Sequence, residues 1–196
     1  MASAASAGEA ARTIALQMLE ERGRGAVLVG VARVDAALER LLQAVLLPAR
    51  GPADTFFQPD RPLGSFGARI SLAARLGLID QPVEQALQTL RRLRNGFAHS
   101  TNTATLTDPG HADKLAQSYV AARSNSLWLP LEQILQEKVC TDRTPLDPTL
   151  RDYILLITIL VAFLEASAQQ LSPQPPAVVM GFGGIQPTGS GIANPY

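Results

Sequence analysis

The sequence predicts an all-α fold: a single-domain bundle of six or seven helices over residues 9–171, followed by a disordered C-terminal tail. Apolar residues recur at intervals of three and four along most of this range, which is the spacing of one face of a helix. No segment shows the strict apolar–polar alternation of a half-buried strand. The chain has 196 residues, 46% of them hydrophobic, which is enough for one domain with a substantial core.

Two helices are expected in the N-terminal part of the chain. Residues 1–8 are small and polar, and we expect them to be disordered. Glu9–Glu21 has the spacing of a short helix, and the glycines that follow interrupt the pattern. Ala26–Leu47 carries a longer stripe of Val and Leu and ends before a proline. Asp35 lies on the flank of this stripe, and Glu39 lies slightly further out.

The stretch Pro62–His99 predicts two helices joined by a tight corner. The first helix contains Phe66 and stops at Gly77, because glycine is common just after a helix end. Asp80 can cap the second helix, which carries one long apolar stripe. So short a connection predicts that the two helices pack against each other, antiparallel or at a steep angle.

One arginine interrupts the apolar face of each helix in this pair. Arg69 falls within the first face and Arg94 within the second. A buried guanidinium keeps its charge, so it needs a carboxylate or an anionic ligand. We therefore expect Asp35 or Glu39 to form an ion pair with Arg69 or Arg94 inside the bundle, with a ligand or phosphate site as the alternative.

Three further helices are expected in the C-terminal half of the chain. Ala112–Arg123 is amphipathic, Trp128–Val139 is short, and Pro148–Leu171 is apolar nearly all round at its centre. An Asp-Pro pair, which supplies an N-cap and a first-turn proline, precedes the first and the last of them. The last helix should be the buried central one, and its apolar run is too short to span a bilayer. Residues 172–196 are rich in Pro and Gly, and we expect them to form a disordered tail.

Composition restricts the classes of function. The formal net charge is zero, with 17 basic and 17 acidic residues, which argues against a strongly electrostatic nucleic-acid binder. Cys140 is the only cysteine. The two histidines, His99 and His111, have no other potential metal ligands near them at the spacing of known metal sites. We therefore expect no disulfide, no metal and no cofactor. The absence of a signal-peptide pattern predicts a cytoplasmic protein without a membrane partner.

The segments PLGSFGARI, LGLI and LRRLRNGFAH all lie between Pro62 and His99. In these residues the chain resembles the mannitol-operon repressor family, a group of all-helical bacterial regulators. The resemblance covers about the central half of the chain and is clearest from Leu63 to His99. It implies a non-enzymatic transcriptional regulator of the repressor type, acting through a protein partner or as a homodimer rather than by reading DNA directly.

A second, narrower resemblance involves Arg94, Asn95 and His99. These residues are similar to the catalytic motif of HEPN-type ribonucleases, which are helical and often dimeric. The resemblance implies metal-free RNA cleavage, with His99 as general acid or base and Arg94 stabilising phosphate charge. In an unbroken helix the two side chains point about 140° apart, so this alternative needs a helix break near Gly96 or a dimer.

A third interpretation is a direct DNA binder. Helix-turn-helix motifs place a small residue, a turn glycine and an apolar residue where this chain has Ala73, Gly77 and Val83. The second helix would then present three glutamines to the bases: Gln81, Gln85 and Gln88. The same pattern also fits an ordinary helical hairpin whose basic residues, Arg91 and Arg92, form a solvated helix end. We therefore expect only weak DNA binding without sequence preference.

Overall fold

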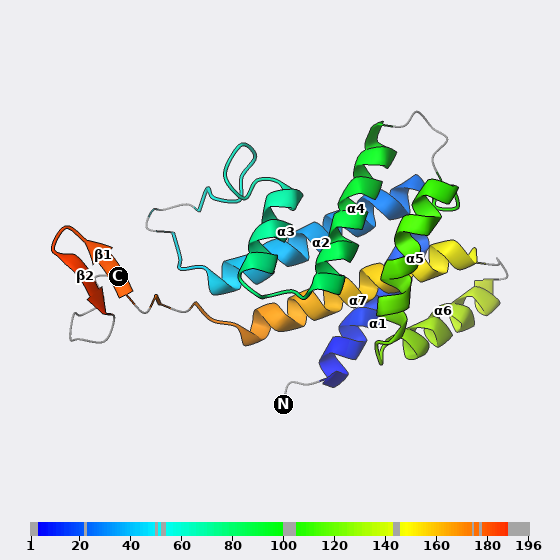
Figure 1. Ribbon diagram of the computed structural model, residues 1–196. Coiled ribbons are helices and arrows are strands. Elements are labelled where there is room, and N and C mark those ends of the chain that lie inside the picture. Colours follow the sequence, from blue (N-terminus) through cyan, green and yellow to red (C-terminus); the bar gives the residue numbers. More distant parts are fainter. Residues whose placement is uncertain are drawn as a thin grey trace.

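A computed structural model of the chain has the expected all-α architecture (Figure 1). The structure describes residues 4–21, 23–49, 51, 54–99, 105–142, 146–173, 175–176 and 178–187, without the side chains of residues 4–7, 99, 109, 139–142 and 186. Seven helices lie in these ranges: α1 Ala4–Glu20, α2 Arg24–Val45, α3 Phe66–Arg75, α4 Gln81–His99, α5 Pro109–Arg123, α6 Trp128–Asp142 and α7 Pro148–Gln170. Two short strands follow, β1 Val178–Gly181 and β2 Gly184–Pro187.

Helix α7 is the central element of the bundle, as its apolar run predicted. It packs against α1, α2, α5 and α6 (Figure 1), and residues 152–162 and Leu164 are buried on all sides of it. Asp147 caps the helix by accepting hydrogen bonds from the backbone N–H groups of Thr149 and Leu150, at 2.8 and 3.0 Å. The hydroxyl of Tyr153 donates to the carbonyl of Val27 at 3.1 Å, which ties α7 to α2.

Helices α7 and α2 approach closely because Gly30 has no side chain. A Cβ atom at this position would lie 2.8 Å from the Tyr153 hydroxyl, 3.1 Å from Cε of Met18 and 3.2 Å from Cγ1 of Ile157. These three atoms belong to α7 and α1, so the glycine is the point where three helices meet. A side chain here would push the helices apart.

Helices α3 and α4 form the expected corner beside α2. Gly77 takes a positive φ of 68°, which ends α3 without strain, and Asp80 caps α4 by accepting from the N–H of Val83 at 3.0 Å. Helix α4 packs against α2, α3 and α5. The α3–α4 pair therefore sits on the bundle through α2, with α5 on the other side of α4.

Three details differ from the sequence-based expectations. Helix α1 begins at Ala4, inside the N-terminal segment expected to be disordered, because its alanines favour helix. The capping carboxylate of Asp108 turns back to Thr105 instead of capping α5. The expected tail contains the antiparallel β1–β2 hairpin, closed by the two residues Phe182 and Gly183.

None of the described helices combines the length and the apolar content needed to cross a membrane.

Replacing Gly30 tests the close approach of α2 and α7. We expect Gly30→Val to lower the free energy of unfolding by about 1–3 kcal/mol, because the added atoms overlap Tyr153, Met18 and Ile157. Urea unfolding monitored by circular dichroism measures this change. Gly8→Ala is the matched control: a Cβ at Gly8 meets no atom within 4 Å, and alanine stabilises a helix interior by roughly 0.5–1 kcal/mol relative to glycine. A Gly30→Val protein as stable as wild type would contradict the packing.

Candidate functional site

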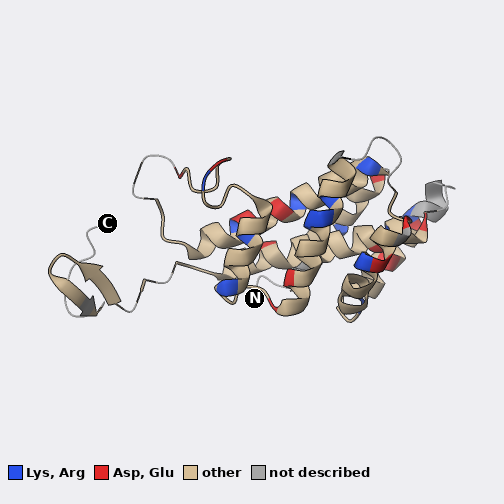
Figure 2. Cartoon of the chain, turned by 45° about the horizontal axis from the view of Figure 1, so that its top comes forward, with Lys and Arg blue, Asp and Glu red and all other residues tan. Residues whose placement is uncertain are grey.

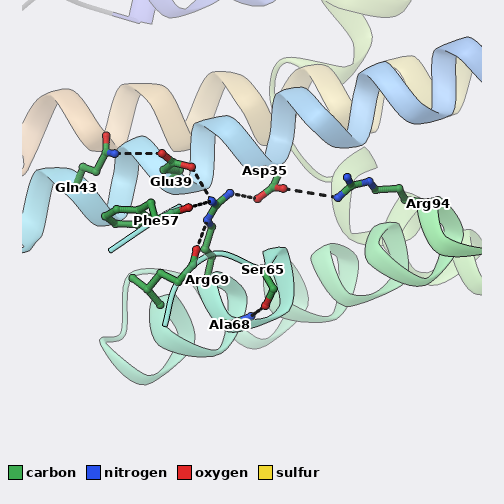
Figure 3. A network of polar contacts seen from close by, with 9 residues as sticks. Asp35, Glu39, Gln43, Phe57, Ser65, Ala68, Arg69 and Arg94 are labelled. Atoms are coloured by element: carbon green, nitrogen blue, oxygen red, sulfur yellow. Dashed lines mark hydrogen bonds and ion pairs between the residues drawn. The ribbon is translucent and has the colours of Figure 1, made fainter. Parts of the chain in front are cut away.

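The structure brings Asp35, Glu39 and Arg69 into one network between α2 and α3 (Figure 3). Nη1 of Arg69 donates to Oδ1 of Asp35 at 2.7 Å, and Nη2 lies 2.8 Å from Oε2 of Glu39. The two acids are one turn apart on α2, so one guanidinium can bridge both. The arginine side chain is only 9% exposed, and the ion pairs are largely removed from water.

Backbone carbonyls complete the environment of Arg69. Its Nε–H donates to the carbonyl of Leu63 at 2.8 Å, and Nη2 also donates to the carbonyl of Phe57 at 3.1 Å. The guanidinium carbon lies 5.9 Å from the centre of the Phe57 ring. Each guanidinium nitrogen thus has a protein partner. Arg69 is a structural clamp that holds the 54–64 loop to α2 and α3: three of its five N–H donors form hydrogen bonds to described groups, and two nearby carboxylates balance its charge.

The 54–64 loop, whose carbonyls bind Arg69, is itself tightly folded. Gly64 lies so close to the loop backbone that a Cβ there would be 2.3 Å from the carbonyl oxygen of Gln58. The N–H of Gly64 donates to the carbonyl of Arg61 at 2.9 Å. Ser65, which follows, caps α3 by accepting from the N–H of Ala68 at 3.2 Å. The loop therefore delivers Leu63 and Phe57 to the arginine in a fixed geometry.

Arg94 occupies a different environment from the one its position in the apolar face predicted. Its Nη1 lies 3.8 Å from Oδ2 of Asp35, and 44% of its side chain is exposed. The buried contacts of this part of α4 come from Leu90, Leu93 and Phe97 instead. The expectation of a buried Arg94 is therefore wrong: its long side chain reaches the edge of the helix interface and keeps its charge in water.

The candidate catalytic residues Arg94, Asn95 and His99 lie at the C-terminal end of α4. Arg94 and Asn95 are exposed, whereas the side chain of His99 lies outside the described part of the structure. Helix α4 continues without a break to His99, so the backbone directs positions 94 and 99 about 140° apart. Within one chain this helix does not provide the break near Gly96 that a shared active site requires.

Helical spacing associates position 99 with other residues than Arg94. Arg92 and Asn95 precede it by seven and four positions, so all three positions share one face of α4. Both Arg92 and Asn95 are exposed. From the sequence, Arg92 was expected to be part of a solvated helix end; its seven-residue spacing to His99 is the signal that could have identified it.

His111, from α5, packs against the same end of α4. Its ring centre is 5.2 Å from that of Phe97, and its Nε2 would lie 3.5 Å from a Cβ at Gly96. Nδ1 is 2.9 Å from the carbonyl of Thr105, so Nδ1 carries the proton and donates. Hydrogen bonds from the backbone N–H and hydroxyl of Thr105 hold the pKa of Asp108 below its usual value. These contacts fix the start of α5 against α4.

A second ionic network joins α5, α6 and α7 and was not expected from the sequence. Asp152 is 6% exposed and binds Nη2 of Arg123 at 2.6 Å and Nη2 of Arg151 at 2.8 Å. Arg151 also reaches Glu132 on α6 at 3.0 Å. Burial raises the pKa of the nearby Tyr119 phenol, whose hydroxyl has no hydrogen-bond partner among the described residues. These groups join α5, α6 and α7.

An apolar groove of about 590 Å³ lies between α4, α5 and α7, and we call it the α4–α5–α7 groove. Its floor is formed by α7 residues, including Leu156, Ile159 and Leu160, which are 2–7% exposed. Phe163, also on α7, lines the groove and is 47% exposed. Asp80 is the only charged residue among the described residues of the lining, and its Oδ1 accepts a hydrogen bond as the cap of α4.

Among the described residues, no group of three His, Cys, Asp or Glu side chains could hold a metal ion. Comparisons with protein-family models, with curated proteins and with solved structures give no match to this chain.

The two arginines provide a direct comparison of a clamp with a surface charge. We expect Arg69→Ala to lower the free energy of unfolding by about 3–5 kcal/mol, because it removes the nearest cation from two partly buried carboxylates and the donor from two carbonyls. Arg94→Ala should cost less than about 1 kcal/mol, because its ion pair is long and solvated.

Chemical denaturation of both variants measures the difference, and Arg69→Lys serves as a further control. Lysine keeps the charge but lacks the planar fork, so it should recover only part of the loss. Equal effects of Arg69→Ala and Arg94→Ala would contradict the assigned roles.

Proposed function

We propose that this protein is a regulator of transcription that acts by binding a helical segment of a protein partner in the α4–α5–α7 groove. The groove is the observation that carries the proposal. The transcriptional setting is supported by the resemblance of Leu63–His99 to the mannitol-operon repressor family. Arg69, whose place in an apolar face suggested a site for an anion, forms ion pairs with Asp35 and Glu39 instead. This favours the binding of a protein partner over the binding of an anionic ligand.

The shape of the groove suits an amphipathic helix. Its lining extends along α7 from Leu156 to Ser167, which corresponds to about 16 Å or three helical turns. The side walls come from the start of α4, with Pro82 and Val83, and from the end of α5, with Ala121. A partner helix of three turns would place apolar residues at i, i+3 or i+4, and i+7 along this floor. The half-exposed Phe163 would provide an aromatic anchor at the contact.

The charge of the groove also favours an apolar partner over a nucleic acid. Proteins that bind nucleic acids neutralise phosphates mainly with Lys and Arg, and the described lining contains neither. Of the three α4 glutamines that would read bases, Gln88 accepts a hydrogen bond from Nε of Arg91 at 3.0 Å, so its amide oxygen is already engaged. Helix α4 is also flanked by α3 and α5, which would limit its entry into a DNA major groove.

Charged substitutions in the groove test the proposal. In cells that carry each variant in place of the wild-type gene, we expect Phe163→Glu and Val83→Glu to change transcript levels in the same way as deletion of the gene. The reason is that a buried carboxylate would prevent an apolar helix from binding. Leu129→Glu is the control, because Leu129 is 67% exposed on α6 and lies outside the groove.

Three outcomes would count against the proposal. If deletion leaves transcript levels unchanged, the regulatory role fails. If both groove variants regulate as wild type does, with folding intact by circular dichroism, the groove is not the binding site. If the purified protein shifts one DNA duplex tightly and in preference to others at physiological salt, direct DNA reading replaces the partner.

An RNA-cleaving activity is the second candidate, favoured by one observation. Arg92 and Asn95 are exposed on the face of α4 that also includes position 99. A phosphate on this face would meet a guanidinium and an amide, which are suitable groups for binding it. A general acid or base within hydrogen-bond reach of the same phosphate would still be required.

On the primary proposal, the purified protein should not cleave RNA at a rate that depends on His99. Incubation of a mixed-sequence single-stranded RNA with wild type, His99→Ala and Arg92→Ala, in EDTA, tests this expectation. Gln85→Ala is the control, because Gln85 is also exposed and lies two turns before Arg92 on the same helix. Cleavage by wild type that is lost in His99→Ala and kept in Gln85→Ala would make the protein an enzyme.

A further inference from the structure

The β1–β2 hairpin exposes a strongly apolar surface. Val178 pairs with Pro187 and Met180 with Ile185, and directly paired residues of an antiparallel hairpin point to the same face. One face of the hairpin is therefore apolar throughout. Met180 is 83% exposed and Ile185 is 74% exposed, while Phe182 at the turn is fully exposed.

Such a hairpin is not expected to remain alone in water. An isolated two-stranded hairpin is marginally stable at best, and it needs a surface to pack on. The sequence after Glu165 contains no charged side chain, and the described strands of the hairpin are drawn without blue or red in Figure 2. The hairpin lies apart from the helices and packs extensively against none of those described (Figure 1).

A second apolar groove lies where the hairpin's own linker leaves the bundle, and we call it the end groove. It has a volume of about 880 Å³ and is formed by the ends of α2, α3 and α7 with part of the 54–64 loop. Four large apolar side chains in its lining are 38–55% exposed: Leu47, Phe56, Leu76 and Leu171. Asp54 is the only charged residue among the described residues that line the groove, and it accepts a hydrogen bond from the N–H of Phe56 at 3.0 Å.

We propose that the end groove binds the β1–β2 hairpin of a second copy of this chain, so that two chains exchange hairpins. The two surfaces match in chemistry, because each is apolar, exposed and almost without charge. A two-fold dimer would bury both hairpins and both end grooves at once, so neither chain would keep an exposed hairpin or an empty groove. This inference concerns a different groove from the proposed partner site and does not depend on it.

The linker favours a second copy over the hairpin's own groove. Residues 172–177 read SPQPPA, and prolines keep themselves and the residues before them extended. With three prolines in six residues, a linker of this composition favours extended conformations of about 3.1 Å per residue. Leu171 and Ser172 themselves line the end groove. For the hairpin to bind the end groove of its own chain, the proline-rich linker would have to reverse direction sharply.

The mass of the full-length chain in solution, measured by light scattering after size exclusion, is the first test. We expect wild type to have twice the chain mass of 20.9 kDa. Met180→Glu on the hairpin and Leu47→Glu in the end groove should each shift the protein to the monomer mass. Both residues are exposed, so neither substitution threatens the fold. Leu129→Glu, similarly exposed on α6, should leave the dimer intact.

Mixing the two variants distinguishes exchange from other dimers. Met180→Glu keeps an intact end groove and Leu47→Glu keeps an intact hairpin, so an equimolar mixture should recover a heterodimer held by one contact. A covalent test uses Met180→Cys and Leu47→Cys in one chain, with Cys140→Ser to remove the native thiol. Oxidation should link the two new cysteines between chains and give a covalent dimer.

Several results would overturn the inference. These are a monomeric wild type, a dimer that survives both glutamate variants, a mixture that remains monomeric, or a disulfide formed within a single chain. The last result would place each hairpin in the groove of its own chain.

Discussion

The rest of the fold around α3 depends on one interaction, the binding of the Arg69 guanidinium by Asp35, Glu39 and two backbone carbonyls. Helix α3 has only ten residues, a length at which an isolated helix is marginal, so it depends on tertiary contacts. Arg69 joins α2, α3 and the loop at once, because its fork of donors can reach carboxylates on one side and carbonyls on the other. The energetic cost of burying the charge is offset only while all of these partners remain in place.

This clamp also positions surfaces that lie beyond it. Phe57, whose carbonyl binds Arg69, is followed by the turns that end at Gly64, and its neighbour Phe56 lines the end groove. The rings of Phe56 and Phe57 meet edge to face at 6.0 Å. Through the carbonyl of Phe57, Arg69 therefore helps to position Phe56 in the lining of the end groove. The polar residues of this region serve the fold, whereas the surfaces suited to binding are apolar.

Much of this arrangement was predictable from the sequence because local signals agreed with the tertiary structure. Breaker residues and caps such as Gly77, Asp80 and Asp147 marked helix ends, and apolar spacing identified α7 as the central helix. Periodicity assigns a residue to a face but gives no depth, so Arg69 and Arg94 had equivalent signals although only Arg69 is buried.

Other features depend on contacts between distant segments. Asp152 precedes the apolar run of α7 in the sequence, and Arg123 and Arg151 accompany it into the interface. Each groove forms where three helices meet, so it could not be predicted from the sequence of any one helix. The hairpin was missed because proline and glycine dominated the composition of the tail and concealed its short Val and Ile strands.

The central claim of this account is that Arg69 is a structural clamp and not a site for an anionic ligand. Nuclear magnetic resonance of the arginine side chains tests it most directly, by following the Nε–H of Arg69 during titration with inorganic phosphate and with a short RNA. The account predicts that this proton exchanges slowly with water and that its signal does not move, since the Leu63 carbonyl and the two carboxylates already occupy the guanidinium. Rapid exchange, or a signal that shifts in a saturable manner with either anion, would contradict it.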